Sequence, residues 1–261
     1  MTLGFAVVDD YDAPVSLPLV LVAGTLGACW GAVLPGLIAR FAVVWPEEQP
    51  QAPAWRRSCP HCGADRPRWW RAAGRCPACG RAPVPGRWLL VPVTALVCAV
   101  PAAAVGPTAV LPAVLLLGAL AVPLAAVDLL VLRLPDPLVG LLFGGGLALL
   151  GLAAVLDGAG HGLLRALAAA AACGAGYGLV ALVLRGQIGF GDVKLGAALG
   201  LYLGWFGWPA VVAGVVFAPV VNLPLVIGLL VSGRTDRRSA APFGPAMLAA
   251  ALSVVTLVAL R

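Results

Sequence analysis

Long apolar stretches divide this sequence and decide which folds are open to it. A helix needs about 20 predominantly apolar residues to cross a bilayer. The chain has eight stretches of roughly this length, at residues 17–44, 88–105, 108–130, 137–156, 163–184, 193–208, 210–231 and 243–260. Hydrophobic residues make up 61% of the chain and charged residues only 11%, which excludes an ordinary soluble domain. We therefore expect an all-α polytopic membrane protein with about eight transmembrane helices in a lipid bilayer.

Arginines gather between the first two stretches and in the last loop. They are Arg56, Arg57, Arg66, Arg68, Arg71, Arg75, Arg81 and Arg87, then Arg234, Arg237 and Arg238. Cytoplasmic loops carry an excess of Arg and Lys, so eight spans place both regions in the cytoplasm and the acidic N-terminus outside. Topology thus accounts for the net charge of +6, and we expect no nucleic-acid partner. The predicted organisation is 1–16 as an extracytoplasmic N-terminus, 17–44 as the first transmembrane helix, 45–87 as a cytoplasmic loop and 88–261 as the remaining transmembrane domain.

The cytoplasmic loop contains two C-x-x-C pairs. Their cysteines are Cys59, Cys62, Cys76 and Cys79. Cytoplasmic thiols stay reduced, and four thiolates at this spacing are typical of a tetrahedral zinc site. Four cysteine ligands leave no open position on the metal, so we expect a structural zinc rather than a catalytic one. A loop that is reduced or disulfide-bonded, without metal, is the alternative.

Two carboxylates lie within or beside apolar runs, where a charged side chain is expensive and usually functional. The predicted topology brings Asp128, near the end of the third stretch, and Asp192, at the start of the sixth, to the cytoplasmic ends of their helices. Four interpretations are open for this pair: a proton or ion path, ion pairs with Arg133 or Lys194, simple helix-end positions, or an aspartic protease centre. In such a centre one carboxylate takes a proton from water while the other donates a hydrogen bond to the scissile carbonyl.

The helix ends predict different roles for the two aspartates. A helix N-terminus favours a carboxylate, which suits Asp192 as the base. The dipole at the C-terminal end of the third helix opposes negative charge, which suits Asp128 as the acid.

Four further residues support this predicted site. Gly189 and Gly191 lack side chains beside Asp192, which would let an extended substrate backbone come close. Asp136 precedes Pro137 and fits the N-cap of the fourth helix. Lys194 would offset the two negative charges, contact substrate, or extend to the membrane interface.

The two aspartate segments are similar to the motifs of a known family. Asp128-Leu-Leu-Val-Leu-Arg-Leu-Pro-Asp136 and Gly189-Phe-Gly-Asp-Val-Lys-Leu195 resemble those of the type IV prepilin peptidases, intramembrane aspartic proteases of the Gly-x-Gly-Asp kind. Pro242-Phe-Gly-Pro245 and the paired C-x-x-C loop also resemble segments of that family. The resemblance runs over roughly residues 20–250, with its motifs in the same order.

This resemblance implies a function and a location. It implies an endopeptidase with Asp128 and Asp192 as the catalytic pair, which removes a short basic leader from type IV prepilin or pseudopilin precursors in pilus assembly or protein secretion. The expected place is the cytoplasmic face of a bacterial inner membrane, which the chain would cross several times.

Many members of the family also methylate the new N-terminus with S-adenosylmethionine, and here the sequence departs from the family pattern. Gly31-Ala-Val-Leu-Pro35 stands where the family has Gly-Ser-Phe-Leu-Asn. Arg87-Trp-Leu-Leu-Val-Pro92 stands where the family has Arg-Tyr-Pro-Leu-Val-Glu. We therefore expect S-adenosylmethionine as a cofactor only if methylation is retained.

Two other classes of protein fit parts of the sequence. One is a proton-coupled membrane transporter that uses Asp128 and Asp192, although the chain shows none of the internal repeats common in transporters. The other is a non-catalytic membrane scaffold built on the cysteine loop, which would leave the Gly-x-Gly-Asp segment without a purpose.

Overall fold

A computed structural model describes residues 16–43, 55–59, 61–65, 75–82, 85–183, 189–231 and 242–260. Most of the expected N-terminal segment 1–16, much of the loop 45–87 and the basic loop 232–241 lie outside these residues. Within the described ranges the chain forms eight α-helices. They are α1 (Leu17–Phe41), α2 (Arg87–Val105), α3 (Leu111–Val131), α4 (Asp136–Leu156), α5 (Gly160–Val183), α6 (Phe190–Phe206), α7 (Trp208–Val231) and α8 (Gly244–Ala259).

The helices follow the apolar stretches, and their ends differ from the expected ones by about three residues at most. Helices α1 to α5 are each long and apolar enough to cross a membrane. Residues Trp208–Pro224 of α7 and the whole of α8 are apolar but shorter. The expectation of an all-α polytopic membrane protein is confirmed.

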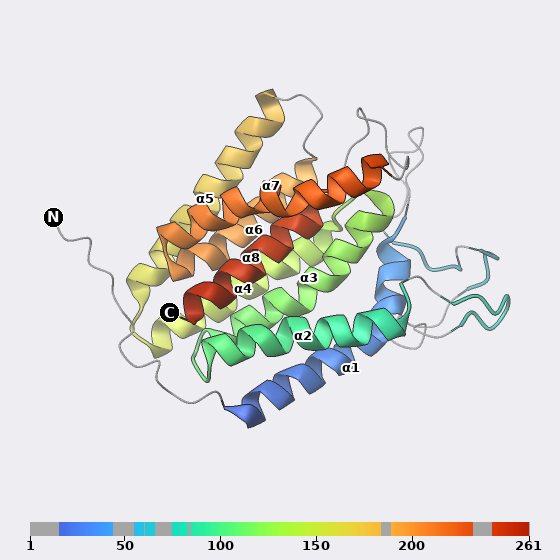
Figure 1. Ribbon diagram of the computed structural model, residues 1–261, viewed down its shortest axis with the longest axis horizontal. Coiled ribbons are helices and arrows are strands. Elements are labelled where there is room, and N and C mark those ends of the chain that lie inside the picture. The colour runs from blue at the N-terminus through green and yellow to red at the C-terminus, as the bar shows by residue number, and fades with distance from the viewer. Residues whose placement is uncertain are drawn as a thin grey trace.

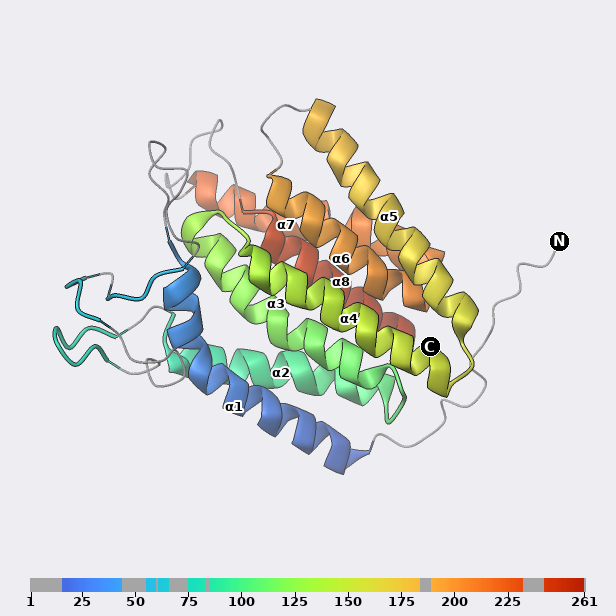
Figure 2. The same cartoon turned by 180° about the vertical axis from the view of Figure 1, so that it is seen from behind.

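Helix α3 occupies the centre of the bundle (Figure 1). It packs against α1, α2, α4 and α8, and its buried residues run from Leu111 to Asp128. A helix that is apolar on all sides can be covered by neighbours on all sides, which explains its central place. The turn from α3 to α4 lies at the same end of the bundle as the cysteine loop, and the views from front and back agree on this (Figures 1 and 2).

Glycines let two pairs of helices approach closely. A methyl group added at Gly27 or Gly31 of α1 would lie 2.6 or 2.7 Å from a backbone oxygen of α2. On α6, a methyl group added at Gly200 would lie 2.7 Å from the Ala169 carbonyl oxygen of α5. Small residues at such spacing drive helix association in membranes through van der Waals contact. The glycines that interrupt α6 are therefore its contact surface with α5.

Arg165 lies at the end of the bundle opposite the α3–α4 turn, where the positive-inside rule does not expect a cation. Its Nε donates to the Gly204 carbonyl at 2.7 Å, and its Nη2 donates to the Trp205 carbonyl. These are among the last carbonyls of α6, where the helix supplies few donors, and the Gly204 carbonyl also accepts the Gly207 N–H at 3.2 Å. Arg165 thus caps the C-terminus of α6, and this local role explains its position.

We expect Gly146→Ala to destabilise the fold. Tyr202 is 1% exposed and donates to the Leu142 carbonyl at 2.9 Å, and a methyl group at Gly146 would overlap its hydroxyl. Overpacking of this kind costs about 1–3 kcal/mol. Thermal unfolding of the purified protein in detergent measures the effect. Gly144→Ala is the matched control, because nothing lies within 4 Å of its added methyl group. Equal unfolding temperatures for the two variants would contradict this account of the packing.

Candidate active site

Asp128 lies in the last turn of α3 and is 5% exposed. Its backbone carbonyl accepts the Leu132 N–H at 2.8 Å, and Leu132 ends the helix in the left-handed conformation with φ 52°. A leucine in this conformation is uncommon, because its Cβ crowds the following carbonyl. The turn directs the chain back toward the bundle immediately after the buried carboxylate.

Asp192 lies in the first turn of α6 and is half-buried. The helix begins at Phe190, with Gly189 as its N-cap, and so starts before the apolar run that suggested a start at residue 193. The Asp192 N–H donates to the Gly189 carbonyl at 3.0 Å. A carboxylate in a first helical turn is stabilised by the free N–H groups of that turn. This part of the expectation for Asp192 holds, with the helix start corrected.

One cavity of about 390 Å³ contains both aspartates in its lining. The other lining residues come from the end of α1, the α3–α4 turn with the first residues of α4, and the start of α6. The structure therefore brings together two acids that are distant in the sequence, at one end of the bundle.

The start of α8 supplies a hydrogen bond to this site that sequence reasoning did not find. The Gly244 N–H donates to Oδ2 of Asp128 at 3.0 Å. Phe243, just before it, packs against Tyr177 of α5 with the ring centroids 6.5 Å apart. In the sequence, the Pro242–Pro245 segment shows only a family resemblance, because a backbone amide leaves no signal of its own.

This hydrogen bond corrects the electrostatic argument made from the ends of α3 and α6. Asp128 does lie at the C-terminal end of α3, but its side chain reaches the N-terminus of α8. Both carboxylates therefore meet the positive end of a helix dipole, and dipoles alone do not distinguish their roles.

Asp136 and Lys194 form an ion pair at the edge of the cavity. Lys194 Nζ lies 2.7 Å from Oδ1 of Asp136, and 5.1 Å from the centroid of the Phe190 ring. The Lys194 side chain is 40% exposed and the Asp136 side chain is 70% exposed. Asp136 is the first residue of α4, while Pro135 is the N-cap, so the expected N-cap role for Asp136 is wrong by one position. Lys194 pairs with Asp136 rather than with Asp128 or Asp192.

Gly189 and Gly191 differ in their surroundings. A methyl group added at Gly189 would meet nothing closer than Oδ2 of Asp192 at 3.6 Å, so this glycine leaves open space beside the acid. A methyl group at Gly191 would lie 3.2 Å from Cβ of Leu134, which is a tight packing contact. Only Gly189 therefore has the open surroundings expected of both.

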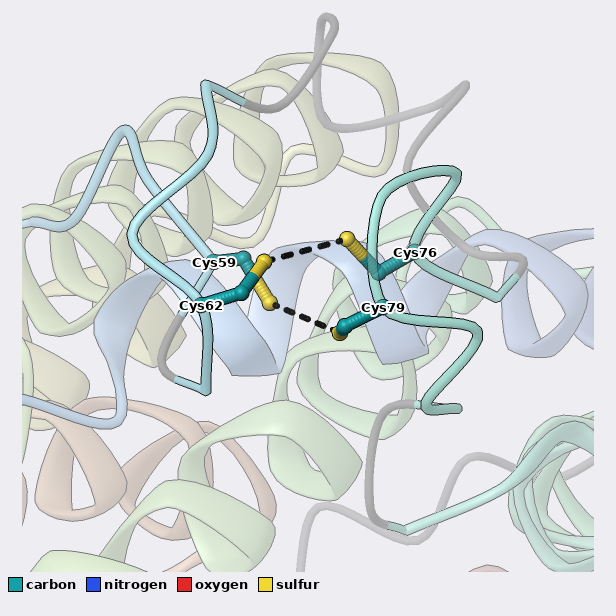
Figure 3. Close-up of side chains that lie close together, drawn as sticks. All are labelled: Cys59, Cys62, Cys76 and Cys79. Carbon is teal, nitrogen blue, oxygen red and sulfur yellow. Dashed lines mark hydrogen bonds between the residues drawn. The ribbon is translucent and has the colours of Figure 1, made fainter.

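The four loop cysteines come together as a cluster (Figure 3). All four sulfurs lie within 4.8 Å of one another, with Cys59 and Cys79 3.9 Å apart and Cys62 and Cys76 3.8 Å apart. Tetrahedral thiolates around zinc at about 2.3 Å would stand about 3.8 Å apart. The sulfur positions fit a four-coordinate metal ion.

The two C-x-x-C pairs have the same backbone geometry. Cys59 N–H donates to the Ala64 carbonyl and Cys76 N–H to the Arg81 carbonyl, both at 2.8 Å. Gly63 and Gly80 each donate back to the first cysteine of their pair, with φ 71° and 69°. This left-handed conformation favours glycine, which explains why a glycine follows each pair.

Backbone amides at the cluster favour the thiolate form of its first cysteines. The N–H groups of His61 and Cys62 lower the pKa of Cys59 to about 6. Those of Cys79 and Ala78 lower the pKa of Cys76. Thiolates are the form of cysteine that binds metal ions.

Comparisons with known proteins agree with this geometry. A model of the type IV leader peptidase family matches residues 113–232, which include both aspartates. A protein of Aeromonas hydrophila named prepilin leader peptidase/N-methyltransferase is 33% identical over 207 residues, which are 73% of this chain and 67% of the relative. A protein of Burkholderia pseudomallei (strain K96243) with the same name is 32% identical over 233 residues, 82% of this chain and 68% of the relative. No solved structure matches the chain significantly. The chain therefore belongs to the type IV leader peptidase family and is a membrane protease.

Proposed function

We propose that this chain removes the basic leader from type IV prepilin or pseudopilin precursors, as an intramembrane aspartic endopeptidase at the cytoplasmic face. The observation that carries the proposal is the single cavity shared by Asp128 and Asp192. The names of the relatives support the substrate class. The transporter alternative has no support of this kind, because the family is one of peptidases.

The surroundings of the two aspartates suggest that one acts as the base and the other as the acid. Asp192 is half-buried and lines the cavity, so it is placed to take a proton from a water molecule there. In Asp128 the Gly244 N–H occupies Oδ2, which leaves Oδ1 to carry the proton that is donated to the scissile carbonyl. Water then adds to the carbonyl carbon. As the peptide bond breaks, Asp192 gives the proton that it took from water to the leaving amine, and Asp128 takes back a proton as the new carboxyl group forms. Asp192 as base and Asp128 as acid is thus our assignment.

The position of the cavity suits a membrane-bound precursor. Its lining includes the α3–α4 turn, which lies at the same end of the bundle as the cysteine loop (Figure 1), the end that the charge distribution predicts to be cytoplasmic. The apolar helix of a precursor can remain in the bilayer there while its basic leader extends into water. The exposed backbone at Gly189 leaves room for an extended substrate beside Asp192.

The N-methyltransferase activity named in the relatives is not part of our proposal for this chain. Pro35 of α1 and Pro92 of α2 stand where the family pattern has Asn and Glu. A proline side chain can neither accept a proton from the new amine nor donate a hydrogen bond to it. Cleavage without methylation, and so without S-adenosylmethionine, is the activity that these residues support.

We also propose that the four-cysteine cluster holds a structural zinc ion. Four thiolates complete a tetrahedral shell, which leaves no position for substrate or water. A zinc ion here would tie together the two C-x-x-C pairs and hold the loop in one conformation at the end of α1.

We expect Asp128→Asn and Asp192→Asn each to abolish cleavage of a co-expressed type IV prepilin. Proton transfer by a positioned carboxylate contributes about 10²–10⁴-fold to rate, and an amide cannot replace it. Mass spectrometry of the pilin reads the leader, the N-terminal residue and any methyl group together. Asp157→Asn, at an exposed carboxylate, is the control. Full processing by either active-site variant would overturn the pair, and a methylated product would overturn the absence of methylation.

We expect Gly244→Ala to lower kcat by about 100-fold, the effect of displacing a catalytic group by about 1 Å. Its methyl group would lie 2.8 Å from Oδ2 of Asp128, so the carboxylate must move. Kinetics of the purified protein in detergent with a synthetic prepilin measure the loss. Gly140→Ala, whose methyl group has no neighbour within 4 Å, is the control and should keep the wild-type rate.

We expect about one zinc ion per purified chain, as a four-cysteine site binds a single ion. Cys59→Ser and Cys76→Ser should each lower the zinc content toward zero, whereas Cys29→Ser in α1 should not. Elemental analysis by mass spectrometry measures the metal. Unchanged zinc in both loop variants would reject the site.

A further inference from the structure

Leu134 lies in the α3–α4 turn and contacts the starts of two other helices. On one side, its Cβ would lie 3.2 Å from a methyl group added at Gly191 of α6. On the other side, its Cδ2 would lie 3.3 Å from a methyl group added at Gly244 of α8. The half-buried leucine side chain therefore fills the space between the first turns of α6 and α8.

Each of these two helix starts holds one of the carboxylates. Gly191 immediately precedes Asp192, and the Gly244 N–H holds Oδ2 of Asp128. Leu134 itself follows Asp128 across the α3–α4 turn. Leu134 thus belongs to the turn that follows Asp128, and its side chain touches the two helix starts that hold the carboxylates.

We infer that Leu134 is a positioning residue, which sets the separation of the Asp128 and Asp192 carboxylates. Protein interiors are close-packed, so the volume of an intervening side chain determines how near two elements can approach. Glycine at both contacts lets the backbones of α6 and α8 approach the leucine directly. The volume of the Leu134 side chain therefore determines the positions of the two helix starts, and with them the positions of the carboxylates.

The ion pair between Lys194 and Asp136 also joins α6 to the start of α4. Both of its side chains are substantially exposed, and exposed ion pairs contribute little to holding a geometry. The apolar contact of Leu134 is the stiffer of the two connections. The left-handed Leu132 turns the chain so that Leu134 can occupy this position.

The inference rests on the proposed peptidase activity and is tested with the full chain purified in detergent. The substrate is a synthetic type IV prepilin with a short basic leader that ends in glycine. We expect Leu134→Ala to lower kcat by about 100-fold and to leave KM within about twofold, because misplaced carboxylates affect the chemical step more than binding. We expect Leu134→Met, which restores most of the volume, to return kcat to within about fivefold of wild type.

Leu149→Ala is the matched control, since Leu149 is a partly buried leucine of α4 that packs against the core. It should lower the unfolding temperature about as much as Leu134→Ala while keeping kcat near wild type. If Leu134→Ala gives no thermal transition, Gly191→Ala tests the same contact from the other side and should lower kcat in a folded protein.

Three results would overturn the inference. They are a kcat for Leu134→Ala no lower than that of Leu149→Ala, a kcat for Leu134→Met as low as that of Leu134→Ala, and an unchanged kcat for Gly191→Ala. A wild-type protein that leaves the prepilin intact would instead contradict the proposed function.

Discussion

The hydrogen bond from the Gly244 N–H to the Asp128 carboxylate joins parts of the chain that are far apart in sequence. A carboxylate buried in an apolar bundle needs a donor, because burial removes the water that would otherwise solvate it. That donor is the first N–H of α8, so the start of α8 must lie against the last turn of α3. The approach leaves no room for a side chain at residue 244. Two helix ends are thereby held together at the cavity.

The rest of the bundle makes this meeting of helix ends possible. Glycines on α1 and α6 let these helices pack closely against α2 and α5, and Arg165 caps the C-terminus of α6. At the near end, α6 brings Asp192 into the same cavity, while Leu134 lies between α6 and α8. Packing contacts therefore mainly determine the shape of the bundle end that contains the cavity. The charged groups occupy positions that this packing creates.

Much of this architecture could be predicted from the sequence. Hydropathy located the helices of the described residues, because each is a long apolar segment that faces lipid or packs inside the bundle. The C-x-x-C spacing indicated the cysteine cluster, and the cost of burying charge drew attention to Asp128 and Asp192. Two predictions about single residues were wrong, because Asp136 is not the N-cap of α4 and Gly191 is a packing contact rather than an open position.

Local composition and spacing therefore determined which segments are helices, where a metal could bind and which acids are unusual. Only the tertiary structure decided what those acids touch. A backbone amide such as that of Gly244, or a spacer such as Leu134, carries no distinctive sequence signal, because every residue has an amide and leucines abound in this chain. Their roles arise from which helix ends pack together, and that depends on contacts between residues distant in the sequence.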